Sequence, residues 1–275
     1  MSFDEIREQV AEANRVLAAV GLAAGAIAGH GHVSMRVPEA PDRFVMKNRG
    51  SLVDVLAKAR AADMVVCDLE GFTVERSGAM TPALEVKMHS CIYKTHPEVL
   101  AIAHTHARFC AVMSVLQQPI VPMCQEGIPL VRRPLPVYPH VAPVITDAEG
   151  MALAATLGSS KAVLLEGHGA TTVGATLEEV VMNMINLEEQ AKMNWYACAA
   201  AGPEHRRIPE ANLDELSNIA AAREQPHLVA LNMGDTPRPP LKGRRPRGQG
   251  DGGTAVSRPR RNGVYAYYAE MGLGD

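Results

Sequence analysis

The sequence predicts a layered α/β domain that occupies residues 1–205 of the 275-residue chain. Segments with helical periodicity alternate with short strand-like segments up to this point, as in folds where helices cover a sheet. Hydrophobic residues make up 47% of the chain and charged residues 21%, which provides enough apolar material for a sizeable core. Residues 206–275 follow a different pattern, and we interpret them as a C-terminal extension.

The first half of the domain begins with a helix and continues with strands. Residues 3–24 place apolar side chains at helical spacing and end near two glycines, which predicts a helix. Residues 32–37 alternate in polarity before a proline, and residues 43–46 and 64–69 are short apolar runs, so three strands are expected. Residues 84–94 return to helical periodicity and stop before a proline, which predicts a second helix.

The second half repeats this alternation. A short apolar strand is expected at residues 99–104 and a helix at 107–116, followed by a proline-rich connection. A helix at 150–157, a strand of the buried type at 162–165 and a long periodic helix at 177–200 complete the predicted elements.

Composition excludes several classes of protein. The net charge is −3, so no general positive field would attract nucleic acid or an anionic membrane. The longest apolar run, Val16 to Gly29, is shorter than the roughly 20 residues that span a bilayer. The first residues lack the order of a secretory signal, and the five cysteines include no CxxC pair. We therefore expect a cytoplasmic protein with reduced thiols and with neither nucleic-acid nor membrane partners.

The C-terminal extension has two distinctive parts. Residues 236–262 are rich in arginine, proline and glycine with a lone acid, so they suit a mobile solvated segment. An arm that meets an anionic substrate or a neighbouring subunit is the alternative. The chain then ends with half of its six tyrosines, and this aromatic end is expected to dock on folded protein. These tyrosines are Tyr265, Tyr267 and Tyr268.

Three histidines follow two of the predicted strands and suggest a metal site. His104 and His106 are two residues apart at the end of a strand, so both imidazoles can face the same point. His168 follows another strand between two glycines, which allow a sharp turn of the backbone. Three histidines are the minimum for a divalent metal that keeps positions open for substrate, although each alone is more often an ordinary histidine. Glu85 is either a proton shuttle near such a site or an exposed acid at a helix start.

Several ordered motifs around these residues resemble the class II aldolase/adducin family. The similarity covers roughly residues 7–200. The matching segments are Glu85-(x)3-His89-(x)2-Ile92-Tyr93-(x)3-Pro97-(x)6-His104-Thr105-His106, residues 162–170, residues 29–36 and residues 66–71. The resemblance implies an α/β/α sandwich around a central, mainly antiparallel sheet, and a cyclic C4 homotetramer with active sites between subunits. It also implies that His104, His106 and His168 bind one divalent metal per subunit and that Glu85 is the catalytic acid/base.

Two departures separate this chain from the sugar-phosphate aldolases of the family. The Asn that contacts the substrate phosphate is replaced by His32, and a serine pair before the catalytic acid is replaced by Ala83-Leu84. The loss of these donors weakens a phosphate site. The Gly-His-Gly-His-Val-Ser run instead resembles the branch that decarboxylates hydroxylated aromatic or pyridine dicarboxylates. His30 and His32 then become candidates for substrate binding and proton delivery, and Arg36 is a further candidate for the substrate carboxylate.

The expected function is a metal-dependent carbon–carbon lyase that decarboxylates a small anionic hydroxyaromatic or heteroaromatic substrate. Zinc, manganese, iron and cobalt remain alternatives for the metal. No organic cofactor is expected, because Gly21-x3-Gly25-x3-Gly29 lacks the dinucleotide spacing. An aldolase for a non-phosphorylated hydroxy-ketone, a non-haem Fe(II) oxygenase and an adducin-like scaffold are the alternatives. In a neighbouring subunit's site, Tyr267 is the expected proton donor and Tyr265 and Tyr268 the expected substrate contacts.

Overall fold

The computed structural model describes residues 2–50, 55–74, 80–217 and 262–272. The chain separates into two compact units, one made of Met1–Arg207 with Arg261–Asp275 and the other of Ile208–Arg260. Within the second unit, the structure describes the helix α7 (Glu210–Ser217). Apart from Asn262, the basic segment predicted over residues 236–262 lies outside the described residues.

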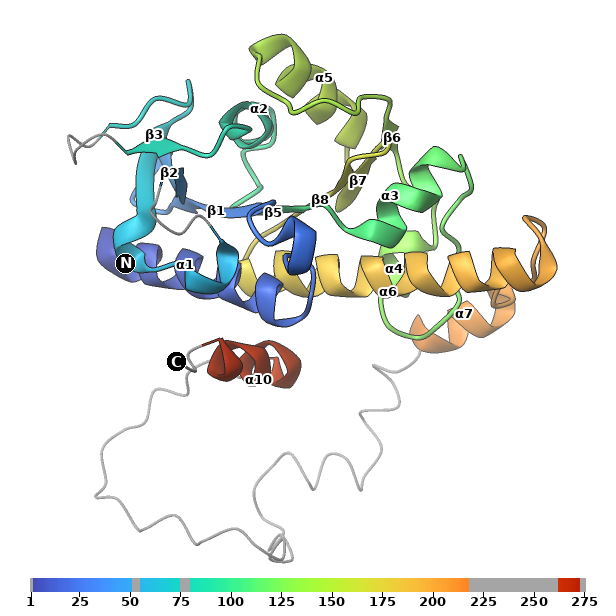
Figure 1. The fold of residues 1–275 in the computed structure, drawn as a ribbon. Coiled ribbons are helices and arrows are strands. Elements are labelled where there is room, and N and C mark those ends of the chain that lie inside the picture. Colours follow the sequence, from blue (N-terminus) through green and yellow to red (C-terminus); the bar gives the residue numbers. More distant parts are fainter. Residues whose placement is uncertain (1, 51–54, 75–79, 218–261, 273–275) are drawn as a thin grey trace, which may run out of the picture. The chain divides into compact units, whose positions relative to one another are not determined.

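An eight-stranded sheet forms the centre of the first unit (Figure 1). Its main path runs β3-β2-β1-β5-β8-β7-β6, and β4 pairs with β2 beside this path. All pairs are antiparallel except β6 with β7, which confirms the predicted α/β class with a mainly antiparallel sheet. The strands are β1 (His32–Val37), β2 (Ala40–Arg49), β3 (Met64–Asp68), β4 (Thr81–Pro82), β5 (Ala101–Thr105), β6 (Val137–Tyr138), β7 (Ala162–Leu165) and β8 (Gly169–Gly174).

Helices cover both faces of this sheet. One apolar core contains buried residues of α1 (Phe3–Ala19), α3 (Arg108–Val115), α6 (Leu177–Ala201) and α10 (Gly263–Met271). The other contains buried residues of α2 (Val86–Thr95) and α5 (Asp147–Leu157). Successive strand residues alternate between the two cores, since side chains on a strand point to opposite faces. Figure 1 shows α1 and α6 below the sheet and α2 and α5 above it, as in the expected sandwich.

Shorter helices lie in the connections of the first unit. They are α4 (Ile128–Val131) and the 3₁₀ turns η1 (Gly25–Ile27), η2 (Leu56–Lys58) and η3 (Ala61–Asp63). In the part of the chain that the structure describes, no helix combines the length and apolar character needed to cross a bilayer.

The structure contains the predicted strands and helices and adds elements that the sequence did not suggest. The largest addition is β8, which lies between β5 and β7 and is buried along its whole length. Its Gly-Ala-Thr-Thr-Val-Gly sequence lacks the bulky apolar run by which the other central strands are recognised. The helix α5 also begins earlier than expected, at Asp147, because Thr146 and Glu149 form a capping box at its start.

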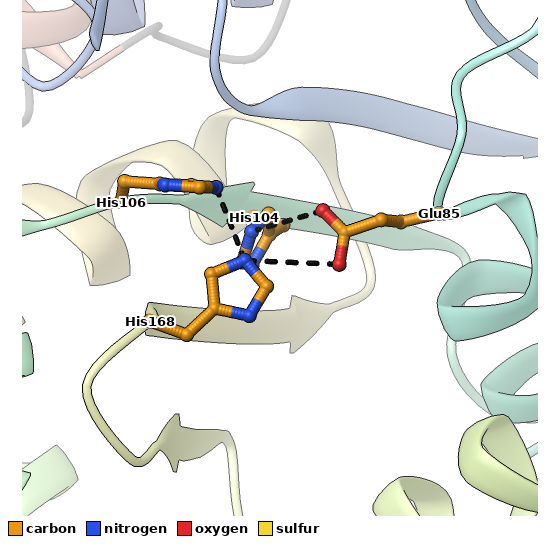
Figure 2. Close-up of side chains that lie close together, drawn as sticks. All are labelled: Glu85, His104, His106 and His168. Atoms are coloured by element: carbon orange, nitrogen blue, oxygen red, sulfur yellow. Dashed lines mark hydrogen bonds and ion pairs between the residues drawn. The ribbon is translucent and has the colours of Figure 1, made fainter. Parts of the chain in front are cut away.

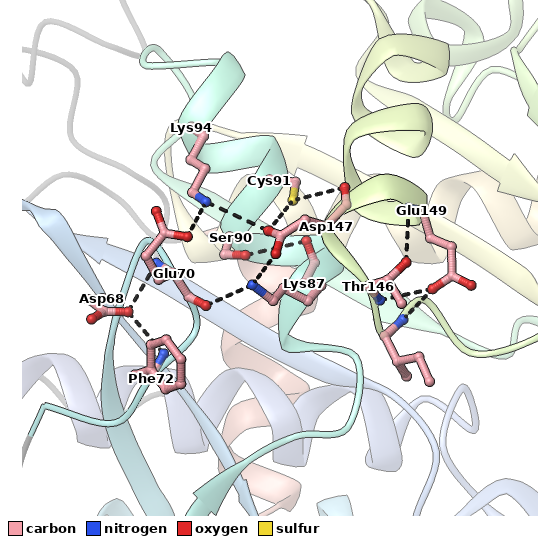
Figure 3. A network of polar contacts seen from close by, with 11 residues as sticks. Asp68, Glu70, Phe72, Lys87, Ser90, Cys91, Lys94, Thr146, Asp147 and Glu149 are labelled. Atoms are coloured by element: carbon pink, nitrogen blue, oxygen red, sulfur yellow. Dashed lines mark hydrogen bonds and ion pairs between the residues drawn. The ribbon is translucent and has the colours of Figure 1, made fainter.

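Polar contacts join α2 to the start of α5 and to the turn after β3 (Figure 3). Lys87 Nζ lies 2.7 Å from Asp147 Oδ2 and donates to the carbonyl of Glu70 at 2.9 Å. Lys94 Nζ pairs with Glu70 Oε2 at 2.8 Å. At the same crossing, a Cβ on Gly150 would come within 2.6 Å of the Lys87 carbonyl, so the two helices approach closely only because this residue is glycine. These contacts hold the first turn of α2, the segment that Glu85 precedes.

The aromatic C-terminal end returns to the first unit as α10. Asn262 caps this helix, and its own backbone N–H donates to Glu178 Oε1 at 2.6 Å. Tyr265 and Ala269 are buried in the core that α1 and α6 also form. The structure therefore places this helix on the protein's own N-terminal and longest helices.

Candidate metal centre

Three histidines and one glutamate converge where β5 ends and β7 turns into β8 (Figure 2). One ligand atom from each of His104, His106, His168 and Glu85 lies within 4.8 Å of all the others. His104 and His106 reach the same point because they are two residues apart at the strand end. The structure thus brings together the three histidines predicted to bind metal and the glutamate predicted to be the acid/base.

Glycines permit this convergence. Gly167 has a φ of +66° and forms the turn that carries His168. Gly169 lies so close to the backbone of Thr105 and His106 that a Cβ would clash with both. The second glycine of the Gly-His-Gly motif therefore allows the close approach of the two strands.

Neighbouring strands orient His104. Its Nδ1 lies 3.1 Å from Thr171 Oγ1, the residue directly opposite it on β8. The Thr171 hydroxyl donates to Met88 Sδ, so its oxygen accepts the Nδ1 hydrogen of His104. The Nε2 of His104 then carries a lone pair, is buried and has no hydrogen-bond partner. Such a lone pair beside a carboxylate fits a cation, and a hydrogen bond on the far ring nitrogen is typical of metal-binding histidines.

Glu85 is buried rather than exposed at the start of α2. Its Oε1 accepts a hydrogen bond from the backbone N–H of Val144 at 3.0 Å. Its Oε2 lies 3.6 Å from His104 Nε2, and its Oε1 lies 3.7 Å from His168 Nε2. One carboxylate oxygen is thus fixed by the backbone while both oxygens face imidazoles.

The charges of the cluster suit a cation. Burial raises the pKa of Glu85, but the surrounding imidazoles of His104, His32 and His168 outweigh it and hold that pKa below its usual range. Burial lowers the pKa of His104 well below the ordinary value and lowers that of His106 to about 4, with help from His168 and His30. The histidines are therefore neutral near pH 7 and the glutamate is charged, which are the states in which these groups bind metals.

A divalent cation fits this donor set. Three neutral imidazoles could hold it, and Glu85 is placed either to add an oxygen ligand or to exchange a proton nearby. Among the residues that the structure describes, Glu85 and the three histidines form a group of side chains close enough together to hold a metal ion.

A cavity of about 300 Å³ opens beside the cluster and receives both candidate substrate-binding histidines. His32 lies opposite His104 across the β1–β5 pair and is buried, whereas His30 is exposed with its ring centroid 4.7 Å from that of His106. Ala83 and Leu84, the residues that replace the phosphate-binding serines, line the same cavity.

The C-terminal end of β2 also lines the cavity, and sequence reasoning missed it. Lys47 and Asn48 are buried and Arg49 is exposed at this wall. The strand prediction stopped at residue 46, but β2 runs antiparallel to β1, so its last residues lie beside the start of β1. The sequence did offer a signal for this wall, because Lys47 and Arg49 flank Asn48 directly after the predicted strand.

Two residues expected to bind substrate lie elsewhere. The Arg36 guanidinium is buried and donates to the carbonyls of Val99, Pro41 and Tyr93. It therefore has a structural role on β1 instead of the predicted carboxylate contact. Tyr265 is 3% exposed and packs into its own subunit's core, so its side chain is not available for a neighbour's substrate.

The other two C-terminal tyrosines are more accessible. Tyr267 is 58% exposed on α10, and Tyr268 packs partly against the core. Neither lines the cavity beside the metal cluster, which is the group of Glu85, His104, His106 and His168 side chains. Their expected roles in a neighbouring subunit stay predictions.

Comparison with known proteins connects this geometry to a family. The chain is 30% identical over 220 residues to 3,4-dihydroxyphthalate decarboxylase from Terrabacter sp. (strain DBF63), covering 78% of this chain and 89% of the relative. It is 27% identical over 223 residues to the enzyme of the same name from Arthrobacter keyseri, covering 78% and 88%. An aldolase II superfamily protein from Pseudomonas syringae has a similar structure, with a TM-score of 0.67 and 22% identity over 84% of this chain and 90% of that one. The Class II Aldolase and Adducin N-terminal domain matches residues 8–195, and the chain therefore belongs to this family.

Proposed function

We propose that this protein is a metal-dependent lyase that decarboxylates a hydroxylated aromatic or heteroaromatic dicarboxylate. The convergence of three neutral imidazoles and one buried carboxylate at an open cavity carries this proposal. The similarity to two 3,4-dihydroxyphthalate decarboxylases over most of both chains supports a lyase and makes dihydroxyphthalates the first substrates to test.

The wall of the cavity supports a substrate with carboxylates. Lys47 and Arg49 bring positive charge to it, and His30 adds a further hydrogen-bonding group. The side chains of Ala83 and Leu84 supply no donors for a phosphate, whereas their apolar surface suits the face of a planar ring. A dianionic aromatic acid would place its ring against this surface and its charges toward β2.

The chemistry requires a place for the electrons of the broken bond. A divalent metal between the three histidines would act as a Lewis acid toward the substrate hydroxyl and a neighbouring oxygen. The ring takes up a proton at the carbon that bears the carboxylate as the hydroxyl tautomerises to a ketone. The carbon–carboxylate bond then breaks, carbon dioxide leaves, and the bonding electrons return to the ring and its oxygen as a phenolate, which takes one proton from water to restore the phenol.

Glu85 is the group proposed to deliver this proton. It lies at the cavity wall within reach of His32, His104 and His168, and because it is ionised it can take the hydrogen of the substrate hydroxyl and pass it to the ring carbon. His30 and His32, which line the same cavity, are the alternatives for this step.

A substrate panel assayed with each metal tests the proposal. Purified protein would be loaded with Mn²⁺, Fe²⁺, Co²⁺ or Zn²⁺ and given hydroxyphthalates, pyridine dicarboxylates and hydroxy-ketones, in air and anaerobically. We expect carbon dioxide release from a hydroxylated dicarboxylate without oxygen consumption. Cleavage of a hydroxy-ketone alone would identify an aldolase, oxygen consumption would identify an oxygenase, and a protein that takes up no metal would be a scaffold.

We further propose that the enzyme is a cyclic homotetramer in which α10 approaches the site of a neighbouring subunit. The exposure of Tyr267, on a helix otherwise anchored by Tyr265 and Ala269, supports this arrangement. Light scattering of the purified protein tests it, with a mass of four chains expected and a monomer contradicting it.

A further inference from the structure

A buried chain of hydrogen bonds leads from the metal cluster into the core between β1 and α2. His32 Nδ1 lies 2.8 Å from His89 Nε2, and His89 Nδ1 lies 2.6 Å from Ser34 Oγ. Ser34 Oγ in turn lies 2.8 Å from the Tyr93 hydroxyl. At the other end, His32 Nε2 faces Glu85 Oε2 at 3.5 Å. Ser34, His89 and Tyr93 are at most 1% exposed, so this chain is shielded from bulk solvent.

The secondary structure places these groups in two facing rows. Glu85, His89 and Tyr93 follow one another at intervals of four residues at the start of and along α2, so they share a helix face. His32 and Ser34 are two residues apart on β1, so they share a strand face. The two rows interleave, and each contact in the chain joins the strand to the helix.

The direction of the hydrogen bonds follows from the two ends. Burial raises the pKa of the Tyr93 hydroxyl well above its usual range, so it keeps its hydrogen, and Ser34 is its hydrogen-bond partner. Tyr93 therefore donates to Ser34, Ser34 donates to His89 Nδ1, and His89 Nε2–H donates to His32 Nδ1. The remaining hydrogen of His32 lies on Nε2, where it faces a carboxylate that can only accept.

The opposite direction leaves two groups unsatisfied. If His32 donated from Nδ1, His89 Nδ1–H would donate to Ser34, and either the Tyr93 hydrogen or the Ser34 hydrogen, both buried, would have no acceptor in the chain. His32 would also turn the lone pair of its Nε2 toward the negative charge of Glu85. Each unsatisfied buried group disfavours this arrangement, because a buried donor without a partner loses its hydrogen bond to water.

We propose that Ser34, His89 and Tyr93 are positioning residues that fix His32 as the tautomer with hydrogen on Nε2. In this state His32 cannot ligate a metal through Nε2, and it presents a donor to Glu85 and to the cavity. Building on the proposed function, His32 is then the hydrogen-bond donor that holds the substrate carboxylate or the Glu85 oxygen as the proton moves. The geometry thus separates His32 from the ligand histidines although all lie within the same cluster.

Nitrogen NMR of the protein labelled with ¹⁵N-histidine tests this inference without any substrate. Spectra would be recorded near neutral pH on metal-free and metal-loaded protein, with His32 and His89 assigned from their Gln variants. We expect His32 to carry its hydrogen on Nε2 and an acceptor on Nδ1. A hydrogen on Nδ1 of His32 in the wild-type protein would overturn the proposal.

Variants of the positioning residues extend the test to the reaction. Ser34→Ala breaks the chain, so the His32 signals are expected to move toward a tautomer mixture and kcat to fall about tenfold, with KM and metal content unchanged. Tyr93→Phe removes the terminal donor but keeps the ring in the core, and a smaller change in the same direction is expected. Thr172→Val is the matched control, because it removes a buried hydroxyl bonded to Val180 and outside the chain.

The outcomes separate this inference from the proposed function. Wild-type tautomer populations and kcat in Ser34→Ala would contradict the positioning role, as would equal effects of Thr172→Val. If Ser34→Ala does not fold, Tyr93→Phe and the wild-type spectrum still decide the matter. If the protein decarboxylates its substrate but His32 carries its hydrogen on Nδ1, only this inference is contradicted. If His32 shows the expected tautomer but the protein has no decarboxylase activity, only the proposed function is contradicted.

Discussion

Two polar clusters meet at Glu85 and differ in how their hydrogen bonds close. From the Tyr93 hydroxyl to His32 Nδ1, each nitrogen or oxygen has a hydrogen-bond partner within the chain, and the terminal His32 Nε2 faces Glu85 Oε2 at 3.5 Å without a hydrogen bond. In the candidate metal cluster, the ring nitrogens and the carboxylate face each other, and His104 Nε2 likewise has no hydrogen-bond partner. The first set of hydrogen bonds closes within the protein as far as His32 Nδ1, whereas the second set of side chains surrounds a point where we propose that a cation binds.

This difference shows that a histidine close to the other ring nitrogens is not for that reason alone a metal ligand. His32 and His104 are opposite each other on β1 and β5, and their ring centroids are 5.1 Å apart. What distinguishes them is the partner of Nδ1: a threonine oxygen for His104 and a histidine nitrogen for His32. The partner of Nδ1 thus decides whether the Nε2 atom that faces the site carries a hydrogen or a lone pair.

Replacing a candidate ligand histidine is expected to have the largest effect on metal content and activity. His104→Ala, His106→Ala or His168→Ala should abolish bound metal and activity while the fold persists, because the site lies at strand ends. Metal analysis and circular dichroism check this, with His96→Ala, a histidine outside the cluster, as control. A variant that kept full metal content would remove that histidine from the site.

Glu85→Gln comes next, since it keeps the shape of the side chain but cannot carry the proton. We expect turnover to fall roughly 10²–10⁴-fold, the range for a general acid or base, while substrate affinity is retained. Exposed Glu189→Gln provides the control. Near-normal turnover would transfer the role to His30 or His32.

Thr171→Val sharpens the distinction between the two clusters. Without the threonine oxygen, His104 loses the acceptor that fixes its tautomer, so metal affinity should fall about 10–100-fold. Titration of metal-free protein with Zn²⁺ measures this. Thr172→Val is the control, because the hydroxyl of this neighbouring residue donates to the carbonyl of Val180. Equal losses of metal affinity in Thr171→Val and Thr172→Val would contradict the role of Thr171 in fixing the His104 tautomer.

The stability of the metal-free protein should depend on pH. Burial holds the pKa of His106 at about 4 and that of His89 well below its ordinary value, so the unfolded chain binds protons that the folded chain does not. Stability is therefore expected to fall as pH is lowered from about 6.5 toward about 4. Thermal melts across this window check the direction, and a melting temperature independent of pH would show that these rings are not buried as neutral groups.

The smallest effect is expected at the C-terminal helix. Tyr267→Phe should lower kcat modestly if the exposed hydroxyl reaches a neighbouring site, without changing the melting temperature. Tyr265→Phe keeps a buried ring in the core and serves as the control for α10 itself. Unchanged kinetics in Tyr267→Phe would leave α10 with only its packing role against α1 and α6.

Much of the site could be predicted because it follows from local spacing and family motifs. His104 and His106 are two residues apart at a strand end, and the Gly-His-Gly turn marks His168, so the residues that converge in the structure could be picked out as candidate ligands from the sequence. The packing partners were not. Arg36 looks like a substrate contact until the carbonyls that surround it are known.

The hydrogen-bonded chain shows which information the sequence lacked. Its members repeat at intervals of four on α2 and two on β1, so each half was recognisable as one face of an element. That these two faces meet depends on how α2 packs against the sheet, which no spacing reveals. The buried strand β8 was missed for a related reason, because threonine and glycine suit a central strand only where neighbours cover them.

Anomalous diffraction from crystals grown with Mn²⁺ or Zn²⁺ tests the central claim most directly. Data collected at the absorption edge of the metal locate the ion without assumptions about activity. The account predicts one peak per chain, bounded by His104 Nε2, His106, His168 and Glu85, with His32 outside the ligand set. A peak elsewhere, a ligand set that includes His32 Nε2, or no peak at saturating metal would contradict it.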